Sequence, residues 1–284
     1  MIDGRTDLRG FVFPDPLQMG DARVGGSTFR AISAFPEFER VHWRDIDFSG
    51  AVMRNARFTE STIERCLFTG ADLFDWRLWG SRILDTSFQR ADLAGSAIGT
   101  GPYRDAGINI WARVDFDRAN MSNAVASECV FLDCSFRRSK LRGVWFTHVT
   151  FDGVVFEGVL QRVKFAAQWS EGKRNPGPMR NADFRGVRFR DVDIRYRFEN
   201  VVFDDTDDIP VIRDYRTVLT RALEMARASR DPRENAQVDL LEVLADHAGD
   251  YDTVLVTADF RGLGYDLHEP ALVNLVKRAQ GDAG

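Results

Sequence analysis

Apolar residues recur at every fifth position through the centre of the chain. One run extends from Trp43 to Ile98 and a second from Trp111 to Phe156, and no repeat position within either run is polar. This period matches neither the 3.6-residue period of a helix nor the two-residue alternation of a strand. The pattern therefore predicts a chain that turns a corner every five residues and points one apolar side chain inward on each side.

A second inward position lies two residues before each of these. In the first run it is mostly small, as at Ala51, Ala71 and Ala91, and in the second run both small residues and valines occupy it. The positions between the inward ones are largely polar. This arrangement predicts a rod with a filled apolar interior and solvated sides.

Three blocks within the pattern carry a family resemblance. Ala71-Asp72-Leu73, Ala91-Asp92-Leu93 and Ala182-Asp183-Phe184-Arg185-Gly186 resemble the A(D/N)LXX unit of the pentapeptide-repeat family. Members of that family fold as a right-handed quadrilateral β-helix, with one unit on each side of a coil. The resemblance covers roughly residues 36–206 and implies a mainly β solenoid of about seven coils.

Two interruptions of the pattern predict loops that leave the solenoid. Four units per coil should stack residues about twenty positions apart, as Phe48, Phe68 and Phe88 are. The longer step from Ile98 to Trp111 predicts a loop near residues 99–110. If this loop returns to the next side of the coil, Phe116 continues the phenylalanine column and the helix is unbroken. A segment rich in Gly, Pro and charge predicts a second loop near residues 167–180.

Both ends of the solenoid need covering, because each exposes unpaired backbone groups. We expect residues 1–35 to form an N-terminal cap. A single match to the repeat unit inside this segment, Asp7-Leu8-Arg9-Gly10, is interpreted as a chance occurrence.

The chain changes period after residue 206, and residues 207–284 are predicted to form a small, mainly helical C-terminal domain. Helical spacing begins after Pro210, a second helix is expected from Pro232 to about Ala248, and a third from Pro270 to Ala279. A short strand is expected at Thr253–Phe260. The domain either caps one chain or joins two chains as a homodimer, and the pattern leaves both open.

Composition agrees with a stacked interior. The 284 residues include 22 Phe but only 5 Tyr. A flat ring can stack on the ring one coil below, whereas a tyrosine hydroxyl in such a column would lack a hydrogen-bond partner. The phenylalanine surplus is therefore interpreted as a consequence of the repeat.

Residues with catalytic or metal-binding chemistry are sparse. The three cysteines and four histidines have no metal-ligand spacing, and Cys129 and Cys134 occupy small inward positions. We expect no cofactor, no metal and no catalytic residue, and hence a protein that is not an enzyme. An alternative active site in the C-terminal domain would lie around His247, Asp250, His268 and Glu269. These residues are interpreted instead as ordinary polar residues on the outer faces of amphipathic helices.

No stretch of the sequence is apolar enough to span a bilayer, and the first ten residues carry charges of both signs. We therefore expect no membrane partner and a cytoplasmic location.

The resemblance also implies a function. Quinolone-resistance and toxin-immunity members of the family mimic DNA and bind DNA gyrase, a topoisomerase, which links them to antibiotic resistance. Loops contact the enzyme in that branch, so the loop residues Tyr103, Arg104, Lys173 and Arg174 become candidate partner contacts. Such mimicry requires surface carboxylates, but the formal net charge of −5 resides in the C-terminal domain and the N-terminal segment, while the repeat region is slightly positive. Gyrase binding is therefore the alternative.

The favoured function is a non-catalytic scaffold that binds another protein. Phe74, Trp79 and Trp145 occupy positions that should face solvent, and exposed aromatic residues often mark binding surfaces. Two basic stretches, Lys164 to Arg174 and Arg185 to Arg190, raise direct nucleic-acid binding. Each is short and interrupted, so the sequence favours a solvated face over a nucleic-acid site.

Overall fold

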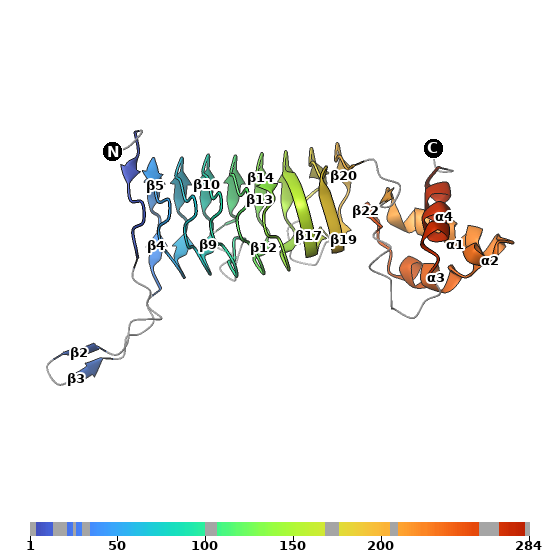
Figure 1. Cartoon of the computed structure of the whole chain (residues 1–284), viewed down its shortest axis with the longest axis horizontal. Coiled ribbons are helices and arrows are strands. Elements are labelled where there is room, and N and C mark those ends of the chain that lie inside the picture. The colour runs from blue at the N-terminus through green and yellow to red at the C-terminus, as the bar shows by residue number, and fades with distance from the viewer. Residues whose placement is uncertain are drawn as a thin grey trace.

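The protein forms a straight rod of stacked coils with a helical unit at its C-terminal end (Figure 1). The computed structural model describes residues 4–13, 22–24, 27–29, 35–99, 107–167, 176–204, 210–255 and 267–281. Each coil has four sides, which confirms the predicted four-sided β-helix and the mainly helical C-terminal region.

We number the four faces of the rod by the inward residues of one coil, in chain order. Face 1 points Phe48 inward, face 2 Met53, face 3 Phe58 and face 4 Ile63. Along every face the coils pair in parallel, so equivalent residues of successive coils lie one above another.

Face 4 is a continuous parallel sheet. Its strands, in order along the rod, are β5 (His42–Arg44), β8 (Thr62–Glu64), β10 (Arg82–Leu84), β11 (Ile110–Ala112), β13 (Val130–Leu132), β16 (Thr150–Asp152), β18 (Met179–Arg180) and β20 (Phe198–Glu199).

Face 3 carries a parallel sheet that is joined in its middle by the bridges Arg77↔Ala97 and Ala97↔Val125. Its strands are β4 (Glu37–Glu39), β7 (Arg57–Thr59), β9 (Arg77–Trp79), β12 (Val125–Ser127), β15 (Trp145–Thr147) and the last parts of β17 (Val155–Ala166) and β19 (Val187–Arg195).

Faces 1 and 2 are formed by short strands and single bridges. Face 1 includes β1 (Thr6–Asp7), β6 (Ile46–Asp47), β14 (Ser135–Arg137) and the start of β17. Face 2 is a ladder of bridges from Val12↔Val52 to Asn120↔Lys140, continued by β17 and β19. These two long strands pair from Gly158↔Val187 to Ala166↔Arg195, and the register omits only the corner residues Arg162 and Asp191, both of positive φ. Each strand therefore continues through a corner instead of ending at it. Strands β2 (Ala22–Val24) and β3 (Ser27–Phe29) form a separate antiparallel hairpin.

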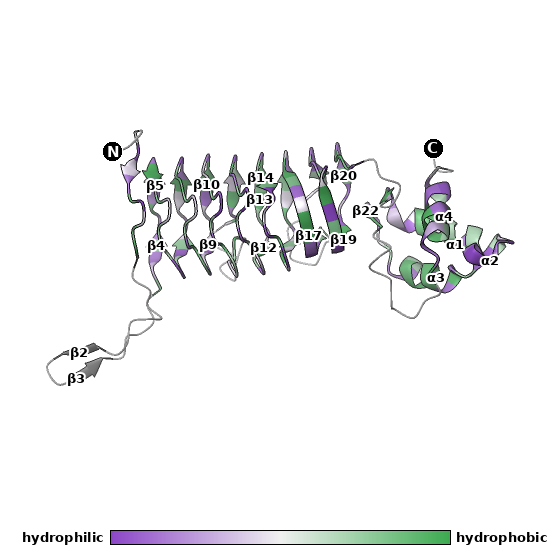
Figure 2. Ribbon diagram, viewed as in Figure 1, coloured by the Kyte–Doolittle hydropathy of each residue, from purple (hydrophilic) through white to green (hydrophobic). Residues whose placement is uncertain are grey.

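The phenylalanine column forms as predicted. Ring centroids lie 5.0 Å apart for Phe48 and Phe68, and 4.9 Å for Phe68 and Phe88, with nearly parallel planes. Phe88 stacks on Phe116 at 5.4 Å, so the loop after Ile98 leaves the helix unbroken. The interior is apolar and the outward residues are mostly polar, which gives the alternating colours along the coils in Figure 2.

Tyr196 places a hydroxyl inside the rod at a second inward position, two residues before Phe198, and outside the stacked column. Its side chain is buried, and its hydroxyl donates to the Val149 carbonyl at 2.8 Å and accepts from the Val149 amide at 3.3 Å. Burial raises the pKa of this phenol. The tyrosine is accommodated because the backbone of Val149, in an earlier coil, lies within reach of its hydroxyl.

The segment interpreted as a chance match is part of the solenoid. Thr6 and Asp7 pair with Ile46 and Asp47, and Val12 bridges to Val52. The register places Leu8 at the head of the phenylalanine column, where it packs against the core. A single repeat unit was insufficient to predict this from sequence, because its column partners lie about forty residues away.

The helical unit has its own apolar core and is joined to the last coil. Its elements are β21 (Val211–Ile212), α1 (Tyr215–Ala228), α2 (Pro232–Asn235), α3 (Val238–Asp246), β22 (Thr253–Val254) and α4 (Glu269–Gly281). The helix expected from Pro232 is divided into α2 and α3, and α4 matches the third expected helix. Residues 256–260 of the expected strand lie outside the described residues, and Thr253 and Val254 pair with β21. Among the described residues no helix is long and apolar enough to cross a membrane.

Asp252 fastens the helical unit to the solenoid. Its backbone pairs with Tyr196 of the last coil, and its buried carboxylate accepts from the Phe198 amide at 2.7 Å and the Asp214 amide at 2.8 Å. The guanidinium of Arg213 lies 3.3 Å from the same carboxylate. One side chain therefore ties the last coil to the start of α1.

Candidate interaction surfaces

The interior of the rod contains no reactive group among the described residues. All three cysteines are buried and unpaired. Burial raises the pKa of Cys66 to about 11 and of Cys134 to about 12, so these thiols stay protonated at neutral pH and are poor nucleophiles. Within the described ranges no group of His, Cys, Asp and Glu could hold a metal ion.

The polar residues of the helical unit do not converge on one site. His268 caps α4 by accepting from the Ala271 amide at 3.2 Å, and Asp250 forms an exposed ion pair with Arg216 at 2.8 Å. His247 faces a different region, with Nδ1 2.8 Å from the Val243 carbonyl. Each of these side chains thus has a local structural contact of its own.

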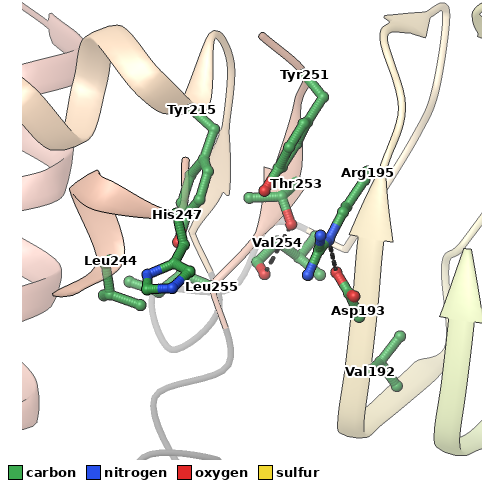
Figure 3. A pocket seen from close by; sticks show the side chains of 10 residues that line it. All are labelled: Val192, Asp193, Arg195, Tyr215, Leu244, His247, Tyr251, Thr253, Val254 and Leu255. Atoms are coloured by element: carbon green, nitrogen blue, oxygen red, sulfur yellow. Dashed lines mark hydrogen bonds and ion pairs between the residues drawn. The ribbon is translucent and has the colours of Figure 1, made fainter. Parts of the chain in front are cut away.

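A cavity of about 210 Å³ lies between the last coil and the helical unit (Figure 3). Tyr215 and Tyr251 stack on one side with centroids 5.4 Å apart, and Arg195 on β19 donates to Asp193 at 2.7 Å on the other. Burial raises the pKa of Tyr251, so its hydroxyl is protonated over the physiological range. His247 also lines the cavity, and none of its described lining residues is a nucleophile with a lowered pKa.

The outward aromatic residues lie on two faces. Trp79 at the end of β9 and Trp145 at the start of β15 both belong to face 3, with two coils between theirs. Trp145 is 56% exposed, and Val125, directly beside it in the ladder, is 43% exposed. Phe74 lies on face 2 instead, where the guanidinium of Arg54 sits 4.9 Å from its ring centroid.

Sequence comparison identifies the repeat. Residues 37–70 and 116–160 both match the family described as pentapeptide repeats. Both stretches of the chain are pentapeptide repeats. No curated protein sequence matches the chain significantly.

Solved pentapeptide-repeat structures resemble this one at low identity. QnrB1, a plasmid-mediated fluoroquinolone resistance protein, shares 16% identity over 71% of this chain and 92% of its own, with a TM-score of 0.35. HetL of Nostoc sp. strain PCC 7120, which is involved in regulating heterocyst differentiation, shares 14% identity over 70% of this chain and 89% of its own, with a TM-score of 0.30. Likenesses this distant carry no argument about function.

The described residues that precede the two expected loops lie on the same face of the rod. Ile98 and Phe165, the last inward residues before the loops, both belong to the inward column of face 3. Tyr103, Arg104, Lys173 and Arg174 themselves lie outside the described residues. Trp79 ends its strand on the same face as Ile98, one coil earlier.

Val125 is the surface residue that the sequence reasoning missed. A valine is common in a strand, so Val125 alone gives no signal. It becomes part of an apolar surface because Trp145 is its direct neighbour in the next coil. Listing the outward residues of each column in order would have shown this pair.

Proposed function

We propose that this pentapeptide-repeat protein is a non-catalytic scaffold that binds another protein through face 3, centred on Trp145. The observation that supports it is the exposure of Trp145 beside exposed Val125, within a parallel sheet. A solvated indole on a rigid face is a typical anchor of protein interfaces, because it buries a large apolar area at a small cost in conformational entropy.

The surroundings of Trp145 suit an interface rim. Lys164 pairs with Trp145 in the next coil, and Ser127 and Thr147 lie at the other end of the same strands. An apolar centre surrounded by polar side chains is the usual anatomy of a protein interface. The backbone of these strands is held by the adjacent coils, so little ordering would be needed on binding.

A comparison of two exposed aromatic residues tests the proposal. Tagged wild-type protein, Trp145→Ala and Phe74→Ala would be used for affinity capture from cells, and each captured protein would be titrated in purified form by calorimetry. We expect binding to weaken at least tenfold in Trp145→Ala and to be unchanged in Phe74→Ala, which removes an exposed ring from face 2. Equal affinity of all three proteins would refute a site on face 3.

Gyrase binding by DNA mimicry is the second candidate function. It requires rows of unpaired carboxylates, whereas many carboxylates of the rod are paired with arginines, as Asp45 is with Arg65 and Asp85 with Arg113. We therefore place it second. A supercoiling assay with purified gyrase, with and without a fluoroquinolone, tests it directly: protection at a near-stoichiometric ratio would move this candidate to first place.

We also propose that the protein is cytoplasmic. We further propose that two chains pair as a homodimer through the helical unit. Val243 on α3 is 43% exposed and offers an apolar contact for such pairing. The mass in solution, measured by light scattering or sedimentation, distinguishes a dimer from the 32.2 kDa monomer.

A further inference from the structure

Basic residues from separate parts of the sequence gather on face 2 near the C-terminal end of the rod. Lys140 and Arg142 flank the inward Leu141, and Arg188 and Arg190 flank the inward Phe189 two coils further on. Arg162 stands at the corner of the coil between them, whose residues Val159 and Gln161 pair with Arg188 and Arg190. At about 4.8 Å per coil, the two rows of cations lie about 10 Å apart.

These five cations are exposed and form no ion pair with a described residue. Elsewhere on the rod arginines are neutralised by neighbours. Arg185 donates to Asp183 and so lowers the pKa of that carboxyl, and Arg138 pairs with Glu157. Asp191, at the corner after Arg190, is an acidic neighbour of the group. One carboxylate does not balance five cations, so the group keeps a positive net charge. We call these five residues the cationic patch.

The chemistry of the patch favours a regularly charged polyanion over a protein. No exposed large apolar side chain lies within it, whereas protein interfaces are anchored by apolar and aromatic residues. Its backbone groups are used in pairing between coils. Long, flexible cations are its most exposed side chains, with the half-buried Val159 and Gln161 between the two rows. Such cationic side chains bind phosphates without reading a base sequence.

We propose that the cationic patch on face 2 binds the phosphate backbone of a nucleic acid. This goes beyond the proposed protein scaffold and uses none of the residues assigned to it. The sequence pattern disfavoured such a site because each basic run is short, but the fold joins cations from three separate segments into one surface. Duplex DNA carries about one charge per 1.7 Å of its axis, so cations in several rows can each reach a phosphate.

The test uses fluorescence anisotropy of a labelled DNA duplex of about 20 base pairs, titrated with the full-length protein from about 50 to 200 mM salt. The variant Lys140→Ala/Arg188→Ala removes two charges from the patch. Its matched control, Arg82→Ala/Arg230→Ala, removes two exposed cations from face 4 and from the helical unit. A polyglutamate peptide of similar charge serves as the competing ligand.

We expect the wild-type protein to bind the duplex with strong salt dependence. The patch variant should bind at least tenfold more weakly and lose about two from the salt slope, while the control changes less than about threefold. Absence of binding at low salt, or equal weakening in both variants, would overturn the proposal. Preferential binding of polyglutamate would overturn it too and assign the patch to an acidic protein. Trp145→Ala should bind DNA normally, so this test is independent of the face 3 interface.

Discussion

At the scale of single residues, the corners of the coil are the most demanding positions. Many corners hold a residue with positive φ, and both Gly and non-Gly residues occupy them, as at Gly50 and Arg90. A side chain is tolerated where it points into solvent. The requirement for glycine therefore comes from two separate causes, backbone conformation and lack of space, which two substitutions can separate.

Gly153→Ala should destabilise the protein more than Gly50→Ala. Both glycines have φ near 67°, which costs an alanine about 1 kcal/mol. A Cβ at Gly153 would lie 2.3 Å from Asp133 Oδ1, whereas at Gly50 no atom lies within 4 Å. We expect a loss of about 1 kcal/mol at Gly50 and about 2–3 kcal/mol at Gly153, measured by chemical denaturation. Equal losses would show that the Asp133 side chain moves aside freely.

At the scale of the structural element, the stacked columns provide the apolar packing that holds adjacent coils together. Phe136 stacks on Phe116 at 4.8 Å and on Phe156 at 5.2 Å and is fully buried. Because every coil contacts only its neighbours, a gap in a column weakens the interface on both sides of it.

Phe136→Ala should therefore cost about 3–5 kcal/mol, the usual range for deleting a buried ring. Phe74→Ala is the matched control, because this ring is 37% exposed and should cost less than about 1 kcal/mol. Thermal and chemical unfolding of both variants would measure the difference. A small loss for Phe136→Ala would mean that the adjacent coils collapse onto the gap.

The repeat also sets the limit of what its sequence pattern can predict at this scale. Phe116 was placed in the correct column across a loop, because a long run of equivalent residues fixes the register. Leu8 was not assigned to its column, because one isolated unit has no adjacent repeat units in the sequence to define the register. The continuation of β17 and β19 as single strands through a corner was likewise missed, since the pattern describes inward residues and not backbone direction.

At the scale of the whole molecule, the joint between solenoid and helical unit depends on Asp252. Its carboxylate serves donors from both parts and is almost fully buried. Asp250, two residues earlier, forms only an exposed ion pair with Arg216. The two aspartates thus offer a direct comparison between a joining contact and a surface contact.

Asp252→Ala should loosen the helical unit. It leaves the amides of Phe198 and Asp214 without their acceptor, and we expect a loss of about 3 kcal/mol or more in the stability of the joint. Limited proteolysis should then release the helical unit faster than in the wild type. Asp250→Ala should behave as the wild type does, and equal release from both variants would contradict a joining role for Asp252.

The sequence by itself determined the period of the coil, the inward column of nearly every repeat and the two places where the step between successive coils lengthens, because these depend on local spacing repeated many times. It also identified Trp79 and Trp145 as residues of one face. Only the tertiary structure decided that Lys140, Arg142 and Arg188 form one unneutralised surface, and that Asp252 joins the two parts. Ion pairing and burial depend on which side chains of different coils meet across space, and a charge in the sequence looks the same whether or not a partner lies beside it.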